Sequence, residues 1–168
     1  MKTHNHNNTA AFTLSEVLVA AALSSLILGM FLTLLVKTLE IWREGIAHMQ
    51  LSEHSRITRE RILHGINGQF GLRNASRSQV IYSTNQVAFS EVTPNNTNAF
   101  TLLLNVNQPA AYSEAGVQYR LIQHSTFVDQ VSITNDENIL NIDLTLAITN
   151  GWKKYTQSQQ IRVYLLNE

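Results

Sequence analysis

One long apolar run dominates the N-terminal part of the chain. Residues 12–36 contain one ionisable side chain, Glu16, which lies near the start of the run. At about 1.5 Å of rise per residue, a helix of this length extends about 37 Å, whereas the hydrocarbon core of a bilayer is about 30 Å thick. The pattern therefore predicts a membrane-spanning helix. A carboxylate inside such a helix costs free energy, so Glu16 is a candidate functional residue.

The helical pattern continues beyond the apolar run. Apolar residues recur at spacings of three and four, as on one face of an amphipathic helix. This stripe consists of Leu35, Leu39, Trp42, Ile46 and Met49. Gly65 and Gly68 are stop signals for the helix. We therefore expect one helix from about Phe12 to His64, followed by a flexible connector in the segment GINGQFG.

From Ser78 onward the period of the pattern changes from that of a helix to that of strands. Short β-rich or alternating runs occur at 79–82, 86–89, 99–106, 117–121, 131–133, 142–148 and 161–165. Turn signals lie at 94–98, 135–138 and 150–151, the last being Asn150-Gly151. These features predict an antiparallel meander with one apolar face. The expected fold class is α+β, with the long N-terminal helix packed through its amphipathic half on this sheet.

Composition excludes several kinds of site. Charged residues make up 14% of the 168 residues, the formal net charge is zero, and there is no cysteine. Nothing here favours a nucleic-acid partner, and disulfides and cysteine metal sites are excluded. The helix histidines His48, His54 and His64 are spaced by six and ten residues, whereas ligands on one helical face lie three or four apart. We expect no metal, no cofactor and no enzymatic activity.

The junction before the apolar run carries a recognisable motif. A polar segment, MKTHNHNNTAA at residues 1–11, is followed by Phe12, Thr13, Leu14, Ser15 and Glu16 and then by the apolar helix. This arrangement resembles the N-terminal cleavage and methylation motif of type IV pilins and type II secretion pseudopilins. Ala11 departs from the family pattern, in which the residue before the cut is usually glycine, and Ser15 replaces the more common aliphatic residue.

The resemblance implies a set of roles for these residues. Prepilin peptidase would cut between Ala11 and Phe12 and methylate the new amino group of Phe12. Thr13, Leu14 and Ser15 would complete the recognition motif. The carboxylate of Glu16 would pair with the amino terminus of a neighbouring subunit during assembly.

The resemblance also implies a domain organisation and a location. The leader would be residues 1–11, the transmembrane or filament-core helix residues 12–36, the amphipathic continuation residues 37–64, and the β-rich pilin head residues 65–168. The basic residues on the two sides of the span, Lys2 against Lys37 and Arg43, do not favour either orientation. By resemblance, the leader is cytoplasmic, and the head lies outside a single-pass anchor in the inner membrane.

The functional hypothesis is a minor pseudopilin of the J or W kind, in a type II secretion pseudopilus or a type IV pilus, acting in initiation or at the tip. The expected partners are other pilins through the N-terminal helix, prepilin peptidase, the inner-membrane assembly platform and membrane lipid. Two alternatives stay open. One is a single-pass anchored binding module that does not polymerise, and the other is an anchored hydrolase with an unrecognised site.

Overall fold

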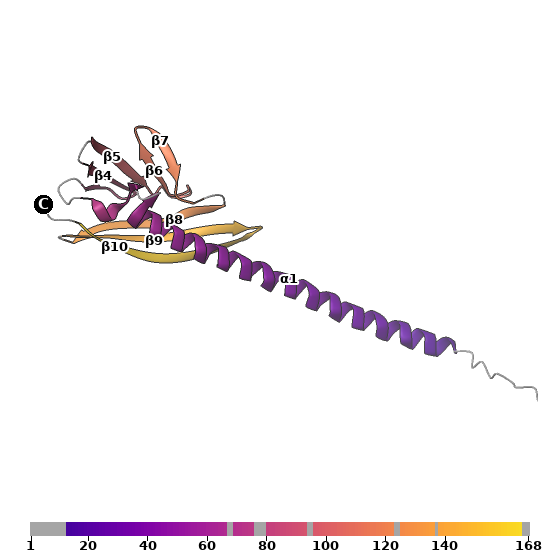
Figure 1. Cartoon of the computed structure of the whole chain (residues 1–168). Coiled ribbons are helices and arrows are strands. Elements are labelled where there is room, and N and C mark those ends of the chain that lie inside the picture. Colours follow the sequence, from indigo (N-terminus) through magenta and orange to yellow (C-terminus); the bar gives the residue numbers. More distant parts are fainter. Residues whose placement is uncertain are drawn as a thin grey trace, which may run out of the picture. The chain divides into compact units, whose positions relative to one another are not determined.

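The computed structural model describes residues 13–66, 69–75, 80–93, 96–122, 125–136 and 138–165 (Figure 1). The chain divides into two compact units, Met1–Arg43 and Glu44–Glu168. The described residues of the first unit form the first part of one long helix. The last part of this helix belongs to the second unit, where it packs on β-sheets.

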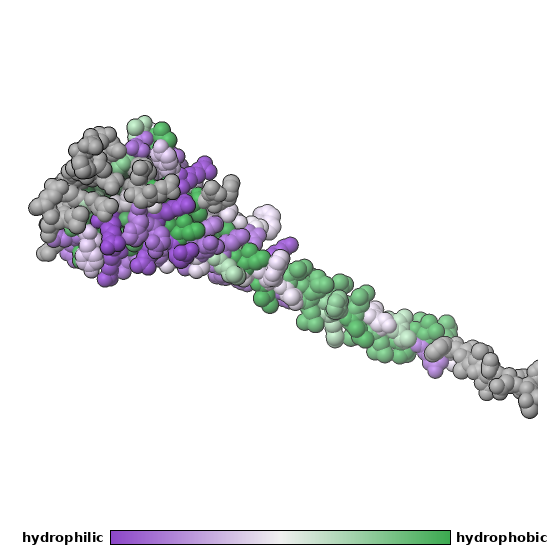
Figure 2. All heavy atoms as spheres, in the orientation of Figure 1, coloured by the Kyte–Doolittle hydropathy of each residue, from purple (hydrophilic) through white to green (hydrophobic). Residues whose placement is uncertain are grey.

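The helix α1 extends from Leu14 to His64. Its end is where the stop signal predicts it, since Gly65 follows with a positive φ of 78° that favours glycine. Its start differs from the expected Phe12, which lies outside the described residues, because Thr13 is not helical and caps the first turn. All residues of α1 in the first unit are exposed, and most of them are apolar (Figure 2).

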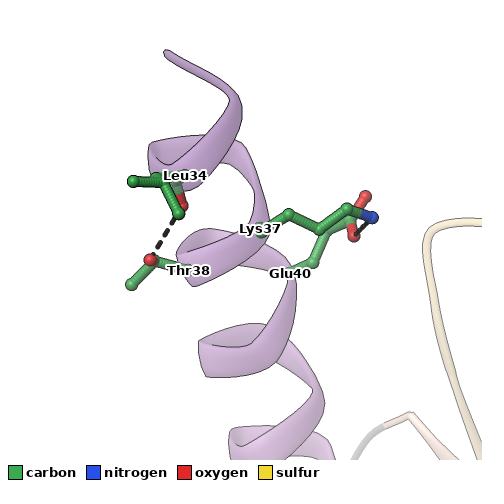
Figure 3. A network of polar contacts seen from close by, with 4 residues as sticks. All are labelled: Leu34, Lys37, Thr38 and Glu40. Atoms are coloured by element: carbon green, nitrogen blue, oxygen red, sulfur yellow. Dashed lines mark hydrogen bonds and ion pairs between the residues drawn. The ribbon is translucent and has the colours of Figure 1, made fainter. Parts of the chain in front are cut away.

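Polar side chains within the first unit bind the helix itself. The hydroxyl groups of Ser25, Thr33 and Thr38 donate to the carbonyl oxygens of Ala22, Gly29 and Leu34, at 2.8, 2.7 and 2.8 Å. Beside Thr38, the ammonium group of Lys37 contacts the carboxylate of Glu40 at 2.9 Å (Figure 3). The hydroxyl groups are thus satisfied without water, as an apolar environment requires.

Two short strands follow the helix. β1 (Gly65–Ile66) and β2 (Gln69–Phe70) form a two-stranded antiparallel sheet, and a 3-10 helix, η1 (Leu72–Asn74), comes next. The segment GINGQFG, expected to be a flexible connector, thus contains paired strands, in which Gly65 pairs with Phe70 and Ile66 with Gln69.

The next five strands form an antiparallel sheet in the order β3-β4-β5-β6-β7. They are β3 (Ile81–Tyr82), β4 (Gln86–Thr93), β5 (Asn96–Leu103), β6 (Ala111–Glu114) and β7 (Val117–Arg120). The sequence pattern missed β6, which is short and has no alternation of polar and apolar residues. It also placed Asn96 in a turn, whereas β5 begins there.

The last three strands form a separate antiparallel sheet in the order β10-β9-β8. They are β8 (Thr126–Asp136), β9 (Ile139–Asn150) and β10 (Lys153–Tyr164). The turn predicted at Asn150-Gly151 is confirmed, since Asn150 pairs with Lys153 and Gly151 has a φ of 64°.

The expectation of one continuous meander is wrong, because the edge of β8 is already occupied. The amide of Asn107 donates to the carbonyl oxygen of Val128 at 2.7 Å, and the amide of Val128 donates to the carbonyl oxygen of Gln108 at 2.9 Å. Val106 forms a parallel bridge with Val128. A loop thus takes the hydrogen bonds that a neighbouring strand such as β7 would otherwise make, and the sheet divides there.

The helix packs on the sheets of the second unit through a face that the sequence pattern did not identify. Its buried residues are Ala47, Leu51, Ser55, Thr58 and Ile62. The predicted stripe is not this face, because Met49, its last residue, is 74% exposed. Three of the five buried residues are small, which lets the helix backbone approach the sheets but gives no strong hydrophobic signal in the sequence.

The buried polar groups of this face are paired. The hydroxyl group of Ser55 donates to Oε1 of Gln159 at 2.8 Å, and that of Thr58 donates to the carbonyl oxygen of His54 at 2.7 Å. The core around them is apolar and includes Leu72, Phe89, Tyr112, Leu144 and Ile161. The α+β class and the packing of one long helix on antiparallel sheets are confirmed.

Candidate processing and assembly junction

The start of α1 is a reciprocal capping box formed by Thr13 and Glu16. The amide of Glu16 donates to Oγ1 of Thr13 at 3.3 Å, and the amide of Thr13 donates to Oε2 of Glu16 at 2.9 Å. Thr13 is the N-cap and Glu16 the third helical residue, which is the usual spacing of this motif. The box satisfies two backbone amides that the first turn of a helix otherwise leaves unpaired.

The hydroxyl group of Thr13 takes part in three contacts, two with Glu16 and one with Ser15. It donates its single hydrogen to Oε2 of Glu16 at 2.9 Å. Ser15, whose Oγ lies 3.0 Å from the same Oγ1, must then be the donor in that contact. Oε2 of Glu16 accepts two hydrogen bonds from Thr13, whereas Oε1 has none among the described residues. One carboxylate oxygen is thus committed to the helix cap, and the other is available for a further donor.

The surroundings of this carboxylate are apolar and open. The side chains of Leu14 and Val17 are 79% and 53% exposed. Of the described residues, only those of α1 form a helix long and apolar enough to cross a membrane, and its most apolar stretch is wholly exposed (Figure 2). The negative charge also lies at the positive end of the helix dipole, which favours it there.

The predicted junction residues are only partly placed by the structure. Ala11 and Phe12 lie outside the described residues, whereas Thr13, Leu14, Ser15 and Glu16 form the first turn. Sequence reasoning missed the cap, although its signal, a threonine followed three residues later by a glutamate, is present at Thr13 and Glu16. Glu16 therefore has a structural role within its own chain, in addition to any role between chains.

The comparisons with known proteins bear on this same segment. A family model described as the prokaryotic N-terminal methylation motif matches residues 6–32. Residues 6–32 carry this methylation motif. The motif is consistent with the type IV pilin and pseudopilin family and supports a type IV pilin-like protein that is processed by prepilin peptidase. No curated protein and no solved structure matches the chain.

The three helix histidines, which the sequence analysis considered as metal ligands, lie in the second unit and contact neighbouring side chains. The ring of His48 meets that of Tyr155 edge-on at 5.4 Å, Nδ1 of His54 lies 2.5 Å from Oγ1 of Thr126, and Nε2 of His64 lies 3.8 Å from Glu60. No cluster of three or more possible metal ligands occurs in the part of the chain that the structure describes.

The end of α1 is held by two residues whose roles the sequence did not predict. Tyr112 is buried, and its hydroxyl group donates to the carbonyl oxygens of Ile62 and Arg61 at 3.0 and 3.3 Å. Burial raises the pKa of Tyr112. Arg61 donates through Nη1 to the carbonyl oxygen of Leu121 at 2.6 Å. These contacts attach the last turn of the helix to the five-stranded sheet and the segment after it.

Proposed function

We propose that this chain is a minor pilin-like subunit that prepilin peptidase processes and that assembles into a type II secretion pseudopilus or a type IV pilus. The observation that carries the proposal is the match to the methylation motif at residues 6–32, whose described part from Leu14 onward belongs to an exposed apolar helix with a carboxylate in its first turn. The role of the subunit is structural. Before assembly, its helix is anchored in the inner membrane with the head outside, and an assembly platform then transfers the subunit into a filament.

The junction supports this assembly through its charges. Cleavage between Ala11 and Phe12 would create a positively charged amino group one residue before the helix cap. A carboxylate held in an apolar environment is stabilised by a cation nearby. Oε1 of Glu16 is open to such a cation, and the amino group of Phe12 on a neighbouring subunit would supply it. The initiating or tip position of the subunit is part of the same proposal.

The exposed helix surface in each unit supports lateral packing between subunits. In the first unit the apolar side chains from Leu14 to Ile41 have no cover. In the second unit, Ile46 and Met49 line a shallow depression on the helix together with Gln50, Glu53 and Arg56. Neither surface is used by the fold of its own unit, so both are open to the helices of other pilins and, before assembly, to lipid.

Two substitutions separate the capping role of Glu16 from a pairing role between subunits. Glu16→Gln keeps an acceptor for the capping box but removes the charge, since glutamine also serves in such boxes. Thr13→Val removes the hydroxyl group of the cap but keeps the charge. If the proposal holds, Glu16→Gln inserts into the membrane and is cleaved but does not enter filaments, whereas Thr13→Val does enter them.

The opposite pattern would refute the pairing role. A Glu16→Gln chain that enters filaments as well as the unmodified chain, together with a Thr13→Val chain that does not, would make Glu16 a capping residue only. Mass spectrometry of each variant confirms that processing is complete before assembly is compared. A chain that is never found in filaments, with or without substitutions, would favour the alternative of an anchored binding module.

A further inference from the structure

The hairpin between β9 and β10 presents one large aromatic side chain to solvent. Trp152, directly after the turn glycine Gly151, is fully exposed, with a relative accessibility of 105%. A tryptophan side chain can bury about 150–250 Å² on binding, so its burial would contribute a large favourable free energy that the exposed side chain does not provide. Its exposed neighbours Thr149, Asn150 and Lys153 are polar, which is unlike the apolar centre of a protein–protein interface.

Contacts between the helix and β10 place this tip within the second unit. The ring of Tyr155 contacts that of His48, and Gln159 is hydrogen-bonded to Ser55, so β10 and the helix run in the same direction. Trp152 precedes Tyr155 by three residues, which is about 10 Å along a strand. Glu44, the first residue of the unit, precedes His48 by four, which is about 6 Å along a helix. The tip therefore lies at the end of the unit where the chain enters.

Two lysines, Lys153 and Lys154, follow Trp152 directly. Lys154 pairs with Asp129 and lies 5.8 Å from the ring centre of Phe127, so this lysine is held on the sheet. Lys153 is exposed, and among the described residues it has no ion pair. An indole ring beside a lysine with a free ammonium group is the combination that occurs at the level of lipid headgroups, where the ring spans the interface and the amine meets phosphate.

When the apolar run spans a bilayer, the surface of that bilayer lies near Glu44, the first residue of the second unit. Glu44 follows Lys37, the first charged residue after the apolar run, by seven positions, so at most about 10 Å of helix separates them. The headgroup region extends about 5–8 Å beyond the hydrocarbon core on each side. With the apolar run inserted, the end of the unit that carries Trp152 is within reach of the headgroups.

We propose that the β9–β10 hairpin is a second membrane contact, in which Trp152 enters the headgroup layer and Lys153 binds the phosphates of anionic lipids. The contact belongs to the subunit before it leaves the membrane, and it would hold the head against the bilayer surface. The proposal rests on the membrane-anchoring part of the proposed function and is independent of filament assembly.

The test uses fluorescence of the full chain in phosphatidylcholine vesicles, with and without phosphatidylglycerol, that carry a quencher near the headgroups. The chain has two tryptophans, so Trp42→Phe leaves Trp152 as the single reporter. The matched control is the triple variant Trp42→Phe, Trp152→Phe and Tyr164→Trp, which places the reporter at the other end of β10, where Tyr164 is 69% exposed. We expect at least twofold stronger quenching of Trp152 than of the control, and Lys153→Gln should weaken the dependence on anionic lipid.

Two results would overturn the proposal in distinguishable ways. Flotation of the chain with vesicles after a carbonate wash reports insertion of the helix independently of the hairpin. If the chain floats but lipid quenches Trp152 no more than the control, the hairpin faces solvent or a protein partner and the lipid contact is wrong. If the chain does not float, the anchoring part of the proposed function fails, and the hairpin contact fails with it.

Discussion

The choice between the two faces of α1 can be tested with a pair of substitutions two residues apart. Leu51 has no exposed surface and belongs to the core of the second unit, whereas the side chain of Met49 is 74% exposed. The sequence pattern favours Met49 as the packing residue, and the structure favours Leu51. Leu51→Ala and Met49→Ala therefore give opposite results under the two interpretations.

The magnitudes follow from the burial of each side chain. Leu51→Ala removes three carbon atoms from the core, for a transfer term of about 2.4 kcal/mol. The cavity left beside the sheets raises the total loss in free energy of unfolding to about 3 kcal/mol, within the range for such substitutions. Met49→Ala removes a side chain from solvent, so the expected change is within about 0.5 kcal/mol.

The assay is urea unfolding followed by circular dichroism on a fragment from Thr38 to Glu168. This fragment contains the whole of the core cluster, and Thr38 can act as the N-cap of the shortened helix. A loss after Met49→Ala that equals or exceeds that after Leu51→Ala would refute the assignment of the packing face. Equal slopes against urea in the two variants would show that both unfold from the same compact state.

Two further predictions concern the end of α1. Gly71→Ala should lower the free energy of unfolding by more than about 2 kcal/mol, because an added Cβ would lie 2.6 Å from the carbonyl oxygen of Leu63 and 2.7 Å from the carbonyl carbon of His64. The control is Gly116→Ala, whose added Cβ meets no atom within 4 Å, so that it tests the effect of a positive φ alone; thermal melts compare the two variants. Tyr112→Phe should cost about 1–3 kcal/mol at neutral pH because it leaves helix carbonyl groups unpaired. Burial raises the pKa of Tyr112, so its contribution to stability is complete below the unfolded-state pKa of about 10. Above that pH the free energy of unfolding of the unmodified fragment should fall by about 1.4 kcal/mol per pH unit relative to that of Tyr112→Phe. Equal alkaline unfolding of the two chains would contradict this.

The sequence was most informative where the signal is local and long. Twenty-five residues with one charge are typical of a long apolar helix that can cross a membrane, and the glycine after His64 marks the end of α1, where the backbone has a positive φ. The hairpin at Asn150-Gly151 was predictable because its turn signal also lies within a few adjacent residues. The threonine-to-glutamate spacing of the cap was equally local, but it was overlooked because the acid was interpreted only as a partner for another chain.

The features that sequence reasoning missed depend on contacts between distant residues. The packing face of α1 is hidden because Ala47, Ser55 and Thr58 are small or polar, and they are buried only because a sheet lies against them. The division of the meander into two sheets depends on the loop at Asn107 and Gln108 occupying the edge of β8. Neither the small residues nor that loop carries a periodic signal.

The most direct measurement of the central claim is the mass of the chain extracted from membranes of cells that process other prepilins. We expect a polypeptide that begins at Phe12 and carries one methyl group on its new amino terminus. A chain that still carries Met1 or Lys2 in those cells would contradict it.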